Sequence, residues 1–530
     1  MKKLLIITSL SLGVALTSCK KADFADNYAD PSKISVTSVE KQYAGFLQSN
    51  ADYILPNYWN YFVVLRTTTN HYTQAVGFIN SDKQYVPGEA GISGNWNSYY
   101  AFLAQYKEMQ KVYNALSAGD QAEKRIFLIT ATIYLYDYTQ KMVDLHGAIP
   151  FSKASALSTN GGDYLSSLPA YDDAATVYTK MLDDLKGFAD ELGTITVSAL
   201  AQNALSTQDF VNKGSIAKWK AYCNSLRLRM LTRVSGVAAM KTRAADEISA
   251  ILGNSAKYPV VAANTDNIQI KVTDLNSNLN SKGFQDGLAS SGWNSNIASK
   301  AMIDHMNTNV DPRLRVMFEA GSNAGGVYNG LDQMANPATQ DSLFNKALTI
   351  ANYNRSTFSH NQYFPGVLIN AAEVSFLKAE YYANAGNAAS AKTAYEDGIK
   401  QSIEFYYGVR ALSNNSLAPA AAPFTTAEVT AYLAKPGIDF SLATTKAAQV
   451  GLIANQKWIH FNVIQSLENW AEVRRLKAPS LAFKVDAASS QTLPPTRWIY
   501  PSSESVYNTA NYNTVKANDN LTTKLFWDVN

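Results

Sequence analysis

Aromatic residues stand next to asparagine and arginine in three parts of this sequence. The three clusters are Tyr58-Trp59-Asn60-Tyr61 with Arg66, Asn70 and Tyr72; Asn95-Trp96-Asn97 with Tyr99 and Tyr100; and Gly292-Trp293-Asn294. Aromatic rings pack on the apolar C–H faces of sugars, and amide and guanidinium groups hydrogen-bond sugar hydroxyls, so such a site needs no catalytic group. These residue types predict a binding site of that kind, with the candidate ligand-binding residues Trp293, Trp96, Arg66, Asn97, Trp59 and Tyr72.

The tryptophans differ in what surrounds them. Trp293 lies between serine, glycine and asparagine, which favours a surface ring over a core ring. Trp96 stands where a helix is expected to begin, so it is either a ligand contact or a packing anchor. Other tryptophans fall on helical faces at core spacing and are interpreted as structural, namely Trp219, Trp458 and Trp470.

Paired carboxylates raise the alternative of an enzyme, because a glycosidase needs two Asp or Glu residues across a cleft. Glu373 and Glu380 are two helical turns apart, and Glu468 and Glu472 are one turn apart. Lysine or arginine accompanies both pairs, so ion pairs explain them better than catalysis. No G-x-S-x-G, Walker or H-E-x-x-H motif occurs in the sequence. The sequence therefore predicts a protein that is not an enzyme and uses no cofactor.

Metal and thiol chemistry also lack a pattern. The five histidines are scattered and have no metal-ligand spacing, and the oxygen-rich run at 264–267 is too short for a calcium loop, so no metal site is expected. Cysteine occurs twice, as Cys19 and Cys223. Cys223 lies in an aromatic helical segment and is interpreted as a small buried hydrophobic residue.

The N-terminus has the layout of a bacterial lipoprotein signal. Lys2 and Lys3 precede a short apolar stretch that ends at Leu16-Thr17-Ser18-Cys19, and a small residue before cysteine resembles a lipobox. We therefore expect a signal peptide at 1–18, lipid (palmitate) on Cys19, a tether at 19–40 and one folded domain at 41–530. The alternative is an ordinary cleaved signal with an incidental cysteine.

The nearly balanced net charge of the chain argues against some classes of binding partner. The sequence has 46 Lys and Arg residues against 43 Asp and Glu, and loss of Lys2 and Lys3 with the signal peptide leaves the two nearly balanced. A nucleic-acid partner would call for a basic stripe, so none is expected. After the signal peptide no apolar run is long enough to cross a bilayer, so contact with a membrane is expected through the lipid alone.

Most of the chain shows helical periodicity, so helices are expected to position the candidate binding residues. Apolar residues recur at intervals of three and four residues, which predicts helices at 99–116, 121–144, 174–192, 215–234 and 371–408. The last of these is two helices separated at Ala385-Gly386-Asn387, which resembles one tetratricopeptide unit. The middle, about 255–365, is rich in Asn, Ser and Gly and predicts long loops, short strands and one helix near 296–306. We therefore expect a mainly α protein with tetratricopeptide-like repeats embedded in one globular body and an extended, turn-rich segment at about 480–530.

Six motifs occur in the order found in SusD/RagB-like proteins. They are the stretch at 144–152, the helix at 218–229, Asp311-Pro312-Arg313, the helix at 373–380, the helix pair at 456–475, and the closing Arg497, Tyr500-Pro501 and Asn511-Tyr512. In the first motif, His146 and Ala148 depart from the family pattern. Each motif alone is weak, but the ordered set covers nearly the whole chain.

The resemblance implies an outer-membrane lipoprotein, facing the cell exterior, that captures oligosaccharides and delivers them to a TonB-dependent transporter. Members of the family use residues before the helix at 99–116 for binding, which supports Trp96. Two alternatives stay open: a peptide-capturing lipoprotein of the same build, and a purely structural component of the transporter complex. An exposed aromatic platform would favour glycan capture, and a backbone-lined cleft with few exposed rings would favour peptide capture.

Overall fold

Helices make up most of the computed structural model, which describes residues 37–288 and 296–530. The mainly α prediction is confirmed. The longer helices are α3 (Val39–Ser49), α6 (Glu89–Asn114), α7 (Ala118–His146), α8 (Ala174–Glu191), α9 (Ala199–Gln208), α10 (Ile216–Val234), α11 (Lys241–Gly253), α13 (Lys300–Asn309), α16 (Ala371–Asn384), α17 (Ala388–Leu412), α18 (Thr426–Leu433), α19 (Lys446–Phe461) and α20 (Ser466–Leu476).

Short helices and strands connect these. The short helices are α4 (Ala51–Ile54), α5 (Thr69–Tyr72), α12 (Phe284–Leu288), α14 (Leu314–Met317), α15 (Pro337–Asp341), α21 (Ser502–Tyr507) and α22 (Thr509–Tyr512). Three antiparallel pairs join β1 (Ile149–Pro150) to β2 (Tyr171–Asp172), β3 (Ile268–Ile270) to β6 (Gly366–Ile369), and β4 (Phe318–Glu319) to β5 (Asn352–Tyr353). The loop-rich middle and its short strands are as expected, and its predicted helix is α13.

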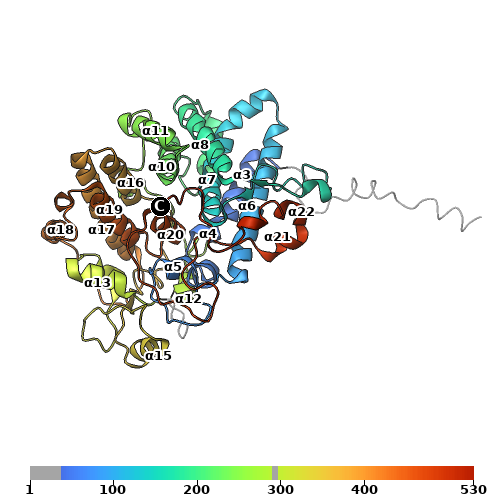
Figure 1. Ribbon diagram of the computed structural model, residues 1–530. Coiled ribbons are helices and arrows are strands. Elements are labelled where there is room, and N and C mark those ends of the chain that lie inside the picture. The colour runs from blue at the N-terminus through green and yellow to red at the C-terminus, as the bar shows by residue number, and fades with distance from the viewer. Residues whose placement is uncertain (1–36, 289–295) are drawn as a thin grey trace, which may run out of the picture.

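The helices expected from the periodicity pack in pairs, as α6 with α7, α8 with α10, and α16 with α17. Figure 1 shows α16, α17 and α19 on one side of the molecule, α6, α7 and α8 on the other, and α20 between them. Local signals define the turn between α16 and α17, where Gly386 has a φ of +78° and the Asn387 side chain accepts from the Ser390 amide. That the pairs form tetratricopeptide-like repeats stays a prediction.

One helix differs clearly from its predicted extent. α6 begins at Glu89, ten residues before the start expected at Tyr99. Gly91 and Gly94 lie in its first two turns. Because glycine has a poor helix propensity, the sequence pattern did not predict that these turns are helical. Packing against its neighbours stabilises the turns that propensity alone does not. Trp96 therefore lies inside α6 and not at its start.

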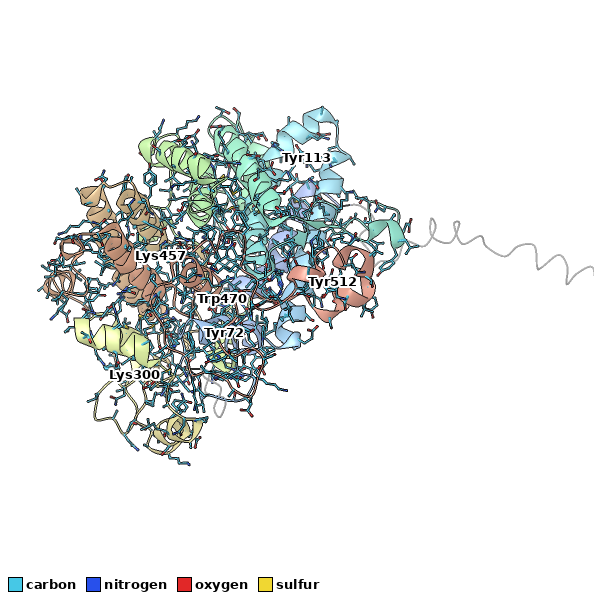
Figure 2. The ribbon with its side chains drawn as sticks, in the orientation of Figure 1. Tyr72, Tyr113, Lys300, Lys457, Trp470 and Tyr512 are labelled. Atoms are coloured by element: carbon cyan, nitrogen blue, oxygen red, sulfur yellow. The ribbon has the colours of Figure 1, made fainter. Side chains whose placement is uncertain are left out.

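Many charged side chains lie inside the protein as the α10–α20 network, which joins helices from both sides of the molecule. Its members are Arg229, Arg233, Lys457 and Arg475 with Asp137, Asp144, Glu373, Glu380, Glu468 and Glu472. Figure 2 labels Lys457 on the left half of the molecule and Trp470 nearer its centre. Burial of so many charges is tolerated only because each is paired. Within 37–288 and 296–530, no helix has the length and apolarity that a membrane crossing requires.

Candidate functional site

A short π-helix, η2 (Trp59–Leu65), carries the exposed aromatic residues of the first cluster. The Arg66 amide donates to the Tyr61 carbonyl at 3.1 Å, which is the i to i+5 bond of a π-helix. π-Helical turns are rare and occur often at functional sites. Tyr61 and Leu65 face the core, whereas Tyr58 and Trp59 are 44% and 43% exposed. Large exposed rings on an otherwise buried turn make this segment the candidate site.

Tyr58 begins a stack of rings and cations along η2. Its ring is 5.1 Å from the ring of Phe62 at 16°, and the Arg66 guanidinium carbon lies 4.4 Å from the Phe62 centroid. The same guanidinium carbon is 5.9 Å from the centroid of Phe78. Burial lowers the pKa of Arg66 from its usual value. An arginine guanidinium in contact with aromatic rings can form cation–π interactions with them. Arg66, predicted from the sequence, therefore shares a surface with Tyr58.

Trp59 reaches across to α6. Its indole lies against Gly94, where an added Cβ would be 2.7 Å from the ring carbon Cζ2. The Gly94 carbonyl also accepts a hydrogen bond from the Tyr53 hydroxyl at 3.0 Å. Asn97 is exposed and follows Gly94 by three residues, so both lie on the same face of α6. We call Tyr58, Trp59, Phe62, Arg66 and Asn97 the η2–α6 platform.

Two of the predicted binding residues lie in the core. Trp96 is 3% exposed, and its ring packs 5.0 Å from His146 and 5.7 Å from Tyr500. Tyr72 is 2% exposed, donates its hydroxyl to the Tyr85 carbonyl and lies 5.5 Å from Trp470. Neither ring reaches solvent in this structure, because each points from its helix toward the packed interior.

The remaining predicted residues divide between the platform and the undescribed parts of the chain. Trp59, Arg66 and Asn97 belong to the platform. Trp293 and Cys19 lie outside the described residues. The chain leaves the described region at the end of α12, which packs against η2, and Trp293 follows Leu288 by five residues in sequence. Trp293 therefore stays a prediction.

Two platform features escaped the sequence reasoning, Phe62 and Gly94. Phe62 stands four residues after Tyr58 and four before Arg66, a spacing that places all three on one side of a helical turn and could have revealed the stack. No sequence pattern could have singled out Gly94, because a glycine is needed there only on account of the Trp59 ring, which comes from a different helix.

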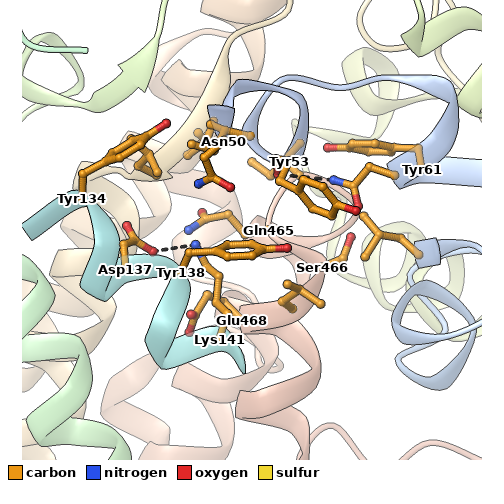
Figure 3. Close-up of a pocket in the computed structure, with 17 residues that line it drawn as sticks. Asn50, Tyr53, Tyr61, Tyr134, Asp137, Tyr138, Lys141, Gln465, Ser466 and Glu468 are labelled. Carbon is orange, nitrogen blue, oxygen red and sulfur yellow. Dashed lines mark hydrogen bonds and ion pairs between the residues drawn. The ribbon is translucent and has the colours of Figure 1, made fainter. Parts of the chain in front are cut away.

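A small cavity of about 50 Å³ adjoins the buried side of η2 (Figure 3). The residues around it come from η2, α7 and α20, and include Asn60, Asp137, Lys141 and Gln465. The Lys141 ammonium lies 2.6 Å from the Asp137 carboxylate, one of the interactions drawn in Figure 3. A cavity of this size holds a few water molecules and not a sugar ring. The exposed side of η2, with Tyr58 and Trp59, is therefore the part of this region that could bind a larger ligand.

The carboxylate pairs do not form a catalytic arrangement. Glu373 lies 2.5 Å from Arg229, and Glu380 lies 2.6 Å from Lys457 and 2.7 Å from Arg475. Burial by itself would raise the pKa of Glu380, but Arg475 and Lys457 outweigh it and hold the pKa below its usual value. Glu380 therefore lacks the raised pKa that a general acid needs, and its contacts are those of a structural ion pair, as the ion-pair interpretation predicts.

Other reactive groups are buried too. Burial raises the pKa of the Cys223 thiol to about 12, so it is protonated and inert. Trp219, Trp458 and Trp470 are buried, which confirms their structural interpretation. Across 37–288 and 296–530, no three His, Cys, Asp or Glu side chains gather as a metal site would require. What these residues offer a ligand is a surface of rings, amides and a guanidinium group.

Comparison with known families identifies the chain. A family model described as "Starch-binding associating with outer membrane" (SusD-like_2) matches residues 35–501. The chain belongs to the SusD-like family. The resemblance inferred from the six sequence motifs is thereby confirmed. Among curated protein sequences, none matches this SusD-like chain.

Solved structures of other SusD-like proteins share the fold. A chitin-binding SusD homologue from Flavobacterium johnsoniae is 22% identical, with a TM-score of 0.68 over 92% of this chain and 99% of its own. A second chitin-binding protein is 21% identical, with a TM-score of 0.70 over 93% and 99%. The SusD-like protein named Bacteroidetes AC2a is 20% identical, with a TM-score of 0.72 over 93% and 100%. At these identities the likeness establishes the SusD-like fold alone.

Proposed function

We propose that this SusD-like protein captures oligosaccharides on the η2–α6 platform. The observation that carries the proposal is the pair of exposed rings, Tyr58 and Trp59, beside Asn97 and Arg66. Rings of this kind stack on sugar C–H faces, and the amide and guanidinium groups suit sugar hydroxyls. The family description, which names starch binding, and two chitin-binding relatives support the same ligand class. Trp293, in the segment after α12, is proposed as a further ring.

The alternatives from the sequence are less well supported. An exposed aromatic platform favours glycan capture over peptide capture, which would use a backbone-lined cleft. It also disfavours a purely structural role, which needs no exposed rings. We propose capture without hydrolysis, since the buried carboxylates are paired with arginine and lysine. A glycan array and a peptide library, both probed with the mature domain, would separate the three functions.

We further propose that the protein is held at the outer membrane by lipid on Cys19, facing the exterior, and hands its ligand to a TonB-dependent transporter. The lipobox at 16–19 and the family description, which names the outer membrane, support this. Gentle detergent extraction and pull-down should recover a large β-barrel partner. Recovery of the lipoprotein alone, at native expression and low salt, would count against the handoff.

The platform is tested by replacing Trp59 with alanine. Loss of one stacked ring should cost on the order of 1 kcal/mol, or about fivefold in affinity. Binding of chitin and maltose oligosaccharides, measured by calorimetry, is expected in the micromolar to millimolar range, roughly −8 to −4 kcal/mol. Melting of the variant should change little, since the ring is 43% exposed.

Tyr507→Ala is the matched control, because Tyr507 is a 68% exposed ring that is not part of the platform. It should leave affinity unchanged. Equal affinities of Trp59→Ala and Tyr507→Ala for every oligosaccharide that the wild type binds would exclude the platform as the site. Trp293→Ala belongs in the same series, and a large drop in its melting temperature would place that ring in the core instead.

A further inference from the structure

A second polar surface lies along the C-terminal half of α6, where it packs with α7 and α8. Two hollows of about 340 Å³ each adjoin there and share Lys107, Gln110 and Ser152. We call the joined hollows the α6–α8 groove. Figure 2 labels Tyr113 at this end of α6, on the opposite side of the view from α12 in Figure 1. Along α6, Lys107 lies ten residues beyond Asn97, about 15 Å at the rise of an α-helix.

The groove concentrates positive charge. Its lining holds four cations, Lys107, Lys111, Arg125 and Lys180, against one carboxylate, Asp184. The whole chain is nearly neutral by comparison, with 46 basic and 43 acidic residues. Cations gathered in a hollow raise the local concentration of anions, because low-dielectric walls focus the field.

Most of these cations already have partners in the protein. Lys180 lies 2.8 Å from Asp184, which also accepts from the Tyr136 hydroxyl. Arg125 donates twice to the carboxylate of Glu191, at 2.8 and 2.9 Å. Lys111 donates to the Ser158 hydroxyl at 2.8 Å. These contacts hold the walls of the groove in place, and among the four cations only Lys107 has not yet been given a partner.

Lys107 is the exception. It is half-buried, and within the described parts of the chain no carboxylate forms an ion pair with its ammonium group. Burial lowers the pKa of Lys107 and repulsion from Lys180 lowers it further, with Asp172 opposing both. Asp172 is itself engaged by the amides of Phe151 and Ser152. A partly desolvated cation that the protein leaves without an ion pair carries a free-energy cost that a bound anion would remove.

The rest of the groove has the chemistry of a saccharide site. Amides of Gln110 and Asn114 and hydroxyls of Ser152 and Thr159 line it, and rings form part of its floor. We propose that the α6–α8 groove binds a carboxylate or sulfate group carried by an acidic oligosaccharide, with Lys107 as the central cation. This site adds to the platform and rests on glycan capture as the proposed function.

The test uses the whole mature protein and acidic oligosaccharides of three kinds: galacturonate, alginate and chondroitin sulfate tetramers. Calorimetry at low salt should detect binding of at least one of them. Lys107→Gln should weaken that binding about fivefold or more, and raising the salt concentration should do the same, because the contact is ionic. Lys271→Gln is the matched control, an exposed lysine outside the groove, and should bind like the wild type.

Several results would overturn the proposal. These are no binding of any acidic tetramer by the wild type, or equal affinity of Lys107→Gln and Lys271→Gln. Competition by free sulfate or galacturonate monomer at the same concentration as the tetramer would reduce the site to one for small anions. If Lys107→Gln fails to fold by thermal melting, Lys111→Gln, on the exposed face of α6, decides instead. Maltotetraose binding, weakened in Trp59→Ala and unchanged in Lys107→Gln, reports on the platform separately.

Discussion

The indole of Trp59 lies against the backbone of Gly94, so closely that a single methyl group at residue 94 would overlap the ring. The contact joins the π-helix η2 to α6 and holds an exposed ring in a fixed place. A ligand platform benefits from such fixing, because a ring already in position loses less entropy on binding. We therefore expect Gly94 to influence ligand binding through its effect on Trp59.

Gly94→Ala should displace Trp59 and weaken oligosaccharide binding severalfold without loss of stability. The ring can swing outward into solvent, and alanine in a helix adds about 0.5–1 kcal/mol over glycine. Gly451→Ala in α19 is the control, because no heavy atom lies within 4 Å of the added Cβ. It should show the stability gain alone. Calorimetry and thermal melting of both variants check this, and unchanged affinity in Gly94→Ala would disprove the link.

Lys457→Met should destabilise the protein strongly. Lys457 lies between Glu380 and Glu472, at 2.6 and 2.7 Å, and all three are buried. Removing the cation leaves buried carboxylates with one partner fewer, which costs about 3–5 kcal/mol. Urea denaturation measures the free energy of unfolding. The control is Lys300→Met, in an exposed pair with Asp304, expected to change stability by less than about 1 kcal/mol. Similar small losses in both variants would refute a stabilising role.

His146→Phe should flatten the dependence of stability on pH. Burial, aided by repulsion from Arg497, lowers the pKa of His146 to about 3, whereas an unfolded histidine titrates near about 6.5. Between these values the unfolded state binds the proton and the folded state does not, so stability falls as pH falls. One such histidine contributes about 1.4 kcal/mol per pH unit.

The measurement is urea denaturation from pH 7 to 4 on the wild type and on His146→Phe. Carboxylates contribute equally to both proteins, so the difference in slope reports His146 alone. Equal slopes would mean that this histidine titrates near its ordinary value when folded.

Cys19→Ala should release the protein from the membrane fraction, since the lipobox predicts that lipid on this cysteine is the anchor. Cys223→Ala is the control, because Cys223 is buried and its sulfur lies 3.2 Å from the Leu185 carbonyl. That variant should still fractionate with membrane and still label with radioactive palmitate. Palmitate labelling of Cys19→Ala would contradict the prediction.

Helix positions and the structural carboxylates could be predicted from the sequence because both depend on local spacing. Apolar residues spaced three and four apart mark the buried face of a helix. Gly386 and Asn387 mark the end of one helix and the start of the next. Lysine and arginine near Glu380 and Glu472 likewise predicted ion pairs. Glu472 pairs with Arg475 on its own helix, whereas the partners of Glu380 come from other helices.

The proposed binding surface could be predicted only in part from the sequence. Trp96 and Asn97 are neighbours in sequence, yet in α6 the side chain of Trp96 is buried and that of Asn97 is exposed. The sequence did not predict the first turns of α6, so it could not predict which of the two residues faces the core. The sequence by itself determined the family, the helices and the residue types available for binding. Only the tertiary structure decided which rings remain exposed, which glycine admits Trp59 and which lysine lacks an ion pair, because each depends on contacts between segments far apart in the chain.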